Sequence, residues 1–263
     1  MLSLLIEPET LQSALSRDDI LLIDLCRDEI YAQSHLPGAV HISPSELVCG
    51  IQPAVGRLPS KEHLEALFSR IGYSPDKHVV AYDDEGGGWA GRLLWTLELI
   101  GHKRYSYLNG GIHAWRDEGL PQSTEDHAPK PSDYQAEVLN PEAAIDRLEL
   151  EERLGSDNFA IWDARSVDEF DGNKGQNLHL GHLPGAVNME WTDAMDRERS
   201  LRLRDYAELI TELGAMGITP DMEVVTHCQT HHRSGFTWLV GKALGFEKMR
   251  ASGRRLLIHE LGG

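Results

Sequence analysis

The chain contains an internal repeat, and this repeat limits its fold more than any other feature of the sequence. The hexapeptide HLPGAV occurs at 35–40 and again at 182–187. The segment IGYSPDKHVVAYD at 71–83 matches MGITPDMEVVTHC at 216–228. The two matches are offset by 147 and 145 residues. Because an offset of this length is the size of a domain, we expect two homologous domains in tandem.

Residues 121–134 separate the two copies. This stretch is rich in proline, serine and charged residues and has few apolar side chains, a composition that is typical of linkers. We therefore predict a first domain at 1–120 and a second domain at 135–263. A chain of 263 residues is long enough for two domains of ordinary size.

Both copies have the same order of predicted elements. Short apolar runs predict buried strands at 21–24, 79–82, 160–163 and 224–227. Apolar residues spaced i, i+3, i+4 and i+7 predict helices over 64–71 and 206–213, and Gly72 and Gly214 stand where C-terminal caps are expected. Strands that alternate with helices predict an α/β fold in which each domain has a mainly parallel sheet with helices on both faces.

The composition excludes some partners and settings. The formal net charge of −17 argues against nucleic acid and against anionic membrane surfaces, because both require a basic face. Three cysteines are too few for a disulfide framework, and Cys26 and Cys49 have no surrounding motif, so we interpret both as structural or incidental. The first residues lack the basic start of a signal peptide and carry Glu7 and Glu9. We expect a cytoplasmic protein.

The third cysteine, Cys228, begins the loop CQTHHR and directly follows a predicted strand. Ligands of open α/β sheets bind at this carboxyl edge. The N–H groups of a short loop and of the next helical turn can converge there and stabilise an anion. A thiol in such a place is held as the reactive thiolate. We therefore predict that Cys228 is a nucleophile.

The rest of the loop supplies the predicted binding residues. Arg233 can offer a charged fork to an incoming oxyanion, and His231 and His232 add positive character when they are protonated. Gln229 and Thr230 are expected to bind through their backbone. In the first copy Asp83 stands in the place of Cys228. A carboxylate is not this nucleophile and repels anions, so we expect the first domain to serve packing and to close the cleft.

Two other interpretations of Cys228 remain open on the residues alone. It could be a buried core thiol, since cysteine is among the most buried residue types, although its polar neighbours fit a core poorly. It could also belong to a zinc site. The ligands would be His227, Cys228, His231 and His232. Structural zinc usually shows two separate ligand clusters and none is evident, so we expect no metal and no cofactor.

Several segments resemble one known family. The tandem halves, Asp-Ala-Arg at 163–165, HLPGAVNMEW at 182–191 and CQTHHRSG at 228–235 resemble the two-domain rhodaneses, or thiosulfate sulfurtransferases, and the loop is similar to that of a bacterial subgroup. The resemblance implies that Cys228 takes the outer sulfur of a donor such as thiosulfate and becomes a persulfide. Backbone N–H groups of residues 229–233 would stabilise it. The acceptor would be cyanide, a dithiol or a protein thiol, and a cysteine desulfurase or thioredoxin-like protein is a possible partner.

The sequence departs from that family at two places. Members that use thiosulfate well often have a second arginine where this chain has Glu169, before Phe170, and a carboxylate there would repel an anionic donor. Arg165 could compensate by binding the donor, or it could form an ion pair at the end of a strand. After Gly245 the chain lacks the family's Gly-Ser-Trp segment, and we expect the last strand of the second domain to be poorly formed.

Two alternative functions and one further residue complete the expectations. A phosphatase or arsenate reductase of the same fold has five residues between its cysteine and arginine, whereas this loop has four, residues 229–232. The shorter loop favours a single sulfur over a phosphoryl group. The chain could also be a persulfide carrier that does not turn over a small donor. Trp191 is expected either to line the mouth of the pocket or to be a core aromatic.

Overall fold

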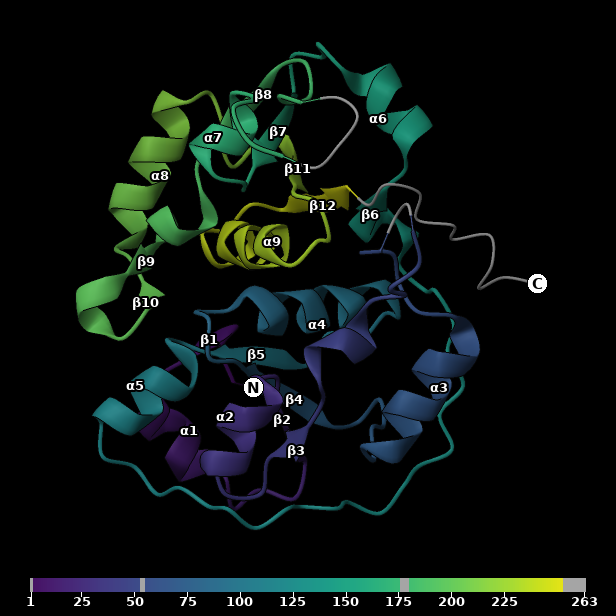
Figure 1. The fold of residues 1–263 in the computed structure, drawn as a ribbon, viewed down its shortest axis with the longest axis vertical. Coiled ribbons are helices and arrows are strands. Elements are labelled where there is room, and N and C mark those ends of the chain that lie inside the picture. The colour runs from purple at the N-terminus through teal and green to yellow at the C-terminus, as the bar shows by residue number, and fades with distance from the viewer. Residues whose placement is uncertain (1, 53–54, 176–179, 253–263) are drawn as a thin grey trace.

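The computed structural model describes residues 2–52, 55–175 and 180–252 of the chain. These residues form two α/β halves stacked on one another, the first half below the second in Figure 1. Each half is built on a five-stranded sheet in which all pairings are parallel. The prediction of two tandem α/β units with parallel sheets is confirmed.

The two sheets have the same topology. The first has the order β1 (Leu5–Ile6), β5 (Tyr105–Leu108), β4 (His78–Tyr82), β2 (Ile20–Asp24), β3 (Val40–His41). The second has the order β6 (Ala144–Ile145), β12 (Lys248–Ser252), β11 (Glu223–His227), β7 (Phe159–Asp163), β8 (Ala186–Asn188). A separate antiparallel pair joins β9 (Met195–Asp196) to β10 (Arg202–Leu203). The repeat in the sequence is therefore a repeat of topology, with β4 and β11 in the same central place.

Helices cover both faces of the sheets. In the first half they are α1 (Pro8–Ala14), α2 (Asp28–Gln33), α3 (Lys61–Arg70), α4 (Gly88–Leu99) and α5 (Gly111–Asp117). In the second half they are α6 (Arg147–Arg153), α7 (Val167–Phe170), α8 (Tyr206–Ala215) and α9 (Arg233–Ala243). Short 3₁₀ turns lie at Pro44–Leu47, Pro141–Ala143, Trp191–Ala194 and Arg197–Arg199. Successive side chains of β2 point to opposite faces of the sheet. Leu21 and Ile23 pack with α3 and α4 on one face, while Leu22 packs with α1 and α5 on the other.

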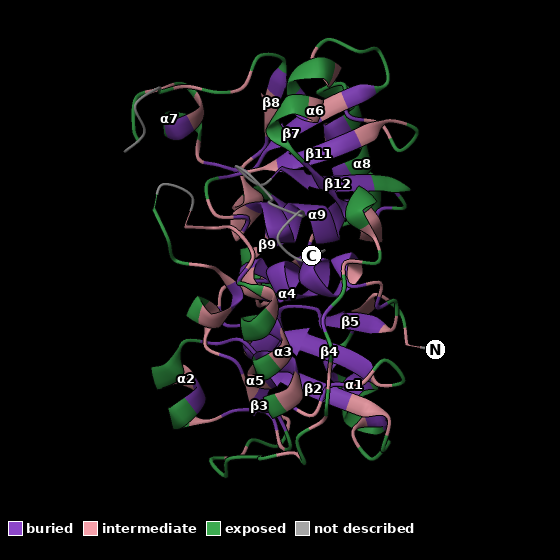
Figure 2. Cartoon of the chain, turned by 90° about the vertical axis from the view of Figure 1, so that its right-hand side faces the viewer, coloured by how far each residue is buried: buried purple, intermediate pink, exposed green. Residues whose placement is uncertain are grey.

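The two halves share one hydrophobic core. A single cluster of buried residues runs from Trp95 on α4 to Phe236 on α9 and into both sheets. Figure 2 shows these two helices buried at the centre of the molecule, between the two sheets. The backbones meet at Gly91 and Gly235, where a Cβ on Gly91 would fall on the Gly235 carbonyl, inside van der Waals contact. Glycine is therefore required where α4 crosses α9.

The segment predicted as a linker packs along the first half. Between residues 121 and 134 the chain forms no helix or strand, and its one bridge pairs Ser123 with His35. The Ser132 hydroxyl donates a hydrogen bond to the Tyr73 carbonyl at 2.6 Å, and Tyr134 packs edge-on against the rings of Tyr73 and Phe68. The domain limits at 120 and 135 stay a prediction.

Two expectations about the second half are wrong. Gly214 lies inside α8, which ends at Ala215, and the glycine that follows the C-cap is Gly217, with the positive φ of +85° that such a position favours. Gly217 is the repeat counterpart of Gly72, which follows the C-cap of α3 with φ of +70°. The last strand is well formed, since β12 pairs with both β11 and β6. The rest of the atypical terminus, 253–263, lies outside the described residues.

None of the helices in the described parts of the chain is long and apolar enough to cross a bilayer.

We expect Gly91→Ala to lower the free energy of unfolding by about 1–3 kcal/mol, because the added methyl group must displace the backbone of α9. Thermal and urea unfolding of the whole chain would measure this loss. Gly214→Ala is the matched control, since a Cβ there meets nothing within 4 Å and alanine favours a helix by up to ~1 kcal/mol. Equal stability of the two variants would contradict the helix crossing.

Candidate active site

Cys228 lies at the carboxyl end of the central strand of the second sheet. β11 ends at His227 and α9 begins at Arg233, so the cysteine and the four residues after it form the turn between strand and helix. The Cys228 side chain is buried, with 4% of the residue exposed. The predicted placement at a strand end, just before a helix, is confirmed.

Ser234 holds the sulfur of Cys228. Its backbone N–H lies 3.4 Å from Sγ and its hydroxyl donates to Sγ at 3.1 Å. The N–H belongs to the first turn of α9, where backbone donors have no partner within the helix. His231 Nδ1 is 2.7 Å from the Ser234 hydroxyl oxygen. The hydroxyl proton points at the sulfur, so the hydroxyl oxygen accepts a hydrogen bond from Nδ1–H of His231. This chain of two hydrogen bonds makes the Ser234 hydroxyl a stronger donor to the Cys228 sulfur.

His231 is a buried, neutral residue. Only 3% of it is exposed, and burial, with the nearby cation of Arg92, lowers its pKa well below the usual value. Positive charge was expected on it only in the protonated form, and this lowered pKa disfavours that form near neutral pH. Its φ is +56°, a left-handed conformation that costs a non-glycine residue about 1 kcal/mol or more. The ring stacks edge-on against Trp95 at 4.3 Å, and this contact fixes the strained turn.

His232 points to the first half of the chain. Its Nε2 is 2.7 Å from a carboxylate oxygen of Glu85, and this contact lowers the pKa of Glu85. The ring lies 4.5 Å from the ring of Trp89 and 5.2 Å from that of Trp191. Trp191 also lies 6.3 Å from Phe236 and is half-buried. Trp191 therefore packs beside the loop that follows Cys228, and its role at a pocket mouth stays a prediction.

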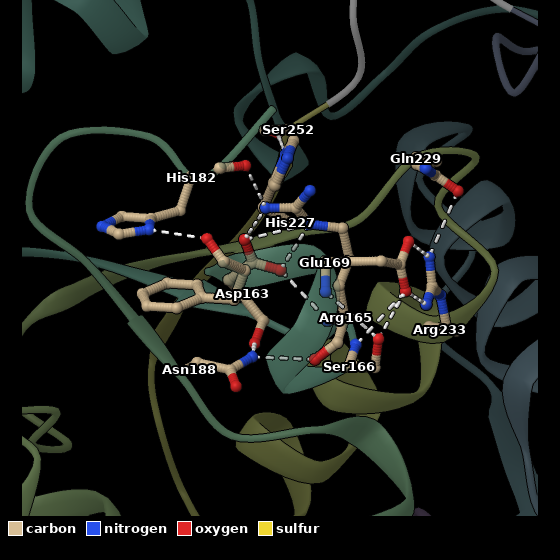
Figure 3. A network of polar contacts seen from close by, with 12 residues as sticks. Asp163, Arg165, Ser166, Glu169, His182, Asn188, His227, Gln229, Arg233 and Ser252 are labelled. Atoms are coloured by element: carbon tan, nitrogen blue, oxygen red, sulfur yellow. Dashed lines mark hydrogen bonds and ion pairs between the residues drawn. The ribbon is translucent and has the colours of Figure 1, made fainter. Parts of the chain in front are cut away.

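The fork of Arg233 is occupied by Glu169 (Figure 3). Two parallel contacts of 2.5 and 3.0 Å join the guanidinium to the carboxylate, and Gln229 Oε1 accepts a third bond at 3.3 Å. The hydrogen bond from Arg233 lowers the pKa of Glu169 to about 2. Glu169 also closes the capping box of α7 with Ser166. The carboxylate thus neutralises the very group that was expected to bind an oxyanion.

Arg165 forms the ion pair at the end of β7. Its Nε and Nη2 bond the Asp163 carboxylate at 2.9 and 2.6 Å, and Nη2 also donates to the Gly181 carbonyl. Figure 3 shows this pair beside the Asn188 amide, which bonds the carbonyls of Asp163 and Arg165. The structure favours the structural interpretation of Arg165 over binding of a donor.

The corresponding turn of the first half surrounds a carboxylate. The Asp83 carboxylate, fully buried, accepts four backbone N–H bonds. The donors are Glu85, Gly87, Trp89 and Ala90, at 2.8–3.0 Å. Burial raises the pKa of Asp83, and these N–H bonds oppose that rise. The first copy therefore has an anion cradle that is filled by its own side chain.

Residues of the first half contact the loop at 228–232. Sequence reasoning predicted only a general packing role for that half and missed these contacts. Glu85 bonds His232, Trp95 packs edge-on against His231, and Arg92 donates to the Thr230 carbonyl at 2.9 Å. Ser234 was also missed, although it directly follows Arg233 in the motif. In the described parts of the chain, no group of three or more His, Cys, Asp and Glu side chains is placed to hold a metal ion.

Comparisons with known proteins show the family and the fold. The model of the rhodanese-like domain matches residues 7–118 and again 146–252. A thiosulfate sulfurtransferase of Azotobacter vinelandii is 49% identical over 249 residues, which are 95% of this chain and 91% of that protein. The sulfur carrier protein TtuD of Thermus thermophilus is 28% identical, over 91% and 87% of the two chains. The 3-mercaptopyruvate sulfotransferase SseA of Escherichia coli has the same fold, with a TM-score of 0.85, 22% identity and coverage of 96% and 98%.

We expect Ser234→Ala to slow the alkylation of Cys228 by iodoacetamide at pH 7 about tenfold or more, because the thiolate loses a hydroxyl donor and a hydrogen bond to a charged group is worth roughly 1.5–3 kcal/mol. Peptide mass spectrometry would follow Cys228 alone. Thr237→Val is the control, since that buried hydroxyl bonds only the Ser234 carbonyl. An unchanged rate in Ser234→Ala would show that the Ser234 hydroxyl does not stabilise the thiolate.

Proposed function

This chain belongs to the rhodanese family of sulfurtransferases, and we propose that it transfers sulfane sulfur through a persulfide formed on Cys228. The observation that carries the proposal is the placement of the Cys228 sulfur at the end of β11, where it receives both the N–H and the O–H of Ser234. These donors, at the positive end of α9, favour an anion on sulfur. The cradle that surrounds the Asp83 carboxylate in the first half supports the same interpretation of the second.

The chemistry consists of two sulfur transfers. The Cys228 thiolate attacks the outer sulfur of thiosulfate, a new S–S bond forms, and the S–S bond of the donor breaks with its electron pair leaving on sulfite. Cyanide then attacks the outer sulfur of the persulfide, which gives thiocyanate and returns the thiolate. A dithiol or a protein thiolate would take the same sulfur as a new persulfide. The enzyme carries a negative charge on sulfur in both resting states, so stabilising that anion is the main task of the loop.

The Glu169–Arg233 pair shapes the choice of donor. With its fork closed by a carboxylate, Arg233 offers little attraction to a dianion. We infer that thiosulfate is usable and that the preferred donor carries less charge, such as the persulfide of a cysteine desulfurase. The same observation favours the second candidate function, a persulfide carrier, which is the role in the name of the relative TtuD. It counts against a phosphatase, because a phosphoryl group needs a free guanidinium at this place.

We predict that incubation with thiosulfate adds one sulfur, about 32 Da, to the intact chain and that cyanide removes it, because a persulfide is the covalent intermediate. Intact mass spectrometry would measure both steps. Cys228→Ser should gain nothing, and Cys26 and Cys49 remain in that variant as internal controls. A gain of sulfur by Cys228→Ser would reject Cys228 as the nucleophile. No gain by wild type with thiosulfate, together with a gain from a desulfurase, would select the carrier function.

We further predict that Glu169→Gln lowers the KM for thiosulfate about tenfold, since it releases Arg233 and removes a like charge, and a factor of ten corresponds to roughly 1.4 kcal/mol. Glutamine preserves the capping box of α7. Steady-state kinetics with cyanide as acceptor would provide the measurement. Glu212→Gln on α8, which breaks the remote pair with Arg204, should leave KM unchanged. An unchanged or higher KM in Glu169→Gln would contradict this account of donor selectivity.

A further inference from the structure

A fully buried arginine from the first half lies against the catalytic loop of the second. Arg92 is in the second turn of α4, one residue after the helix crossing at Gly91, and 0% of it is exposed. Burying a guanidinium is costly unless its donors are satisfied and its charge is compensated. The contacts of Arg92 therefore indicate what the charge is for.

The fork of Arg92 binds three backbone carbonyls. Nη1 donates to Gly56 at 2.8 Å and to Thr230 at 2.9 Å, and Nη2 donates to Leu47 at 2.9 Å. Thr230 is two residues after Cys228. A Cβ on Gly56 would overlap the Thr230 backbone, so Arg92, the segment at Gly56 and the catalytic loop are in direct contact. One cation thus ties two segments of the first half to the loop of the second.

None of these contacts compensates the charge with a carboxylate. Burial lowers the pKa of Arg92 to about 10, and the negative charge of Cys228 and Cys49 in their thiolate forms acts in the opposite direction. The buried Nε has no hydrogen-bond partner among the described residues. The guanidinium also lies over the ring of Trp95, with 5.1 Å between its carbon and the ring centroid, the same ring that packs on His231.

Most of the other charged groups around the loop have a partner of opposite charge. The titratable groups that face the loop are His227, His231, His232 and Arg233 of the loop and its flanks, Glu85 and Cys49 of the first half, Glu169 of α7, and Asp163 and Arg165 at the end of β7. Arg233 pairs with Glu169, Arg165 with Asp163, and His232 with Glu85. His231 is neutral, and His227 Nδ1 contacts the Ser252 hydroxyl. Among Arg92, Arg165 and Arg233, Arg92 is the one that has no carboxylate partner in the described parts of the chain.

We propose that Arg92 is a positioning residue, supplied by the non-catalytic half, that holds the catalytic loop through the Thr230 carbonyl and places a buried positive charge beside the sulfur anion on Cys228. The thiolate of Cys228 is then the counterion of Arg92, for which the first half provides no carboxylate. This inference rests on the proposed function only in that Cys228 is the reactive group. It also gives the first half a specific part in the chemistry, although its own turn is filled by Asp83.

The test separates the charge of Arg92 from its hydrogen bonds. Arg92→Gln removes the charge and keeps amide N–H donors, while Arg92→Lys keeps the charge and loses the planar fork. The rate of Cys228 alkylation by iodoacetamide, a neutral reagent, is measured at pH 7 and at its high-pH plateau in the full chain by peptide mass spectrometry. A merely structural role would change both rates alike, whereas the charge acts on the fraction of thiolate at pH 7.

We expect Arg92→Gln to lower the pH 7 rate about tenfold or more relative to its plateau, because a nearby buried charge is worth at least such a factor. Arg92→Lys should keep the ratio of the two rates within about threefold of wild type. Arg250→Gln is the matched control, since Arg250 is equally an inward-facing arginine but is neutralised by Glu149 and Glu223. It should lose stability and keep the ratio.

Two results would overturn the proposal: a wild-type ratio in Arg92→Gln, or equal losses in the glutamine and lysine variants. If Arg92→Gln yields no folded protein, Arg92→Met takes its place, because methionine also removes the charge and keeps an apolar stem in the buried site. A tenfold fall of the ratio in Arg92→Met with a ratio near wild type in Arg92→Lys supports the charge, and a wild-type ratio in Arg92→Met rejects it. Alkylation needs no sulfur donor. The outcome is therefore independent of whether thiosulfate forms a persulfide, and failure of this inference is distinguishable from failure of the proposed function.

Discussion

The close crossing of α4 and α9 is the contact on which the rest of the structure depends. Each of these helices begins directly after the turn that follows a central strand. When Gly91 and Gly235 let the two backbones touch near the helix starts, the turn of one half is brought to the other half as well. Glu85, Arg92 and Trp95 can then reach the loop that follows Cys228. The site is thus a product of the packing between halves as much as of the second sheet.

The two turns have the same architecture and differ in what occupies them. In the first, the Asp83 carboxylate takes up N–H donors that the start of α4 leaves unsatisfied. In the second, the shorter reach of Cys228 leaves its sulfur beside the Ser234 N–H and hydroxyl. A carboxylate arrives with its own two oxygens and completes the turn. A thiolate presents one atom, to which a second sulfur can be added.

The sequence predicted the features that depend on short-range pattern. The repeat predicted two like units, the apolar runs predicted the strands, and the position of Cys228 after one of them predicted the reactive edge. It failed where the answer depends on which side chains meet in space. The pairing of Glu169 with Arg233 and the burial of His231 against Trp95 join residues 64 or more positions apart, and no local pattern encodes them. The wrong prediction of a C-terminal cap at Gly214 could have been avoided from the sequence, because the repeat aligns Gly72 with Gly217.

A common core for both halves has a consequence for how such a duplicated chain can change over time. The copy that has Asp83 where the other has Cys228 still contributes its helix α4 to the interior that α9 also lines. A substitution on α4 that alters this packing therefore also alters the packing of α9, the helix that follows the Cys228 turn. Changes of sequence in the two copies are coupled through this interior, so neither copy can vary independently of the other.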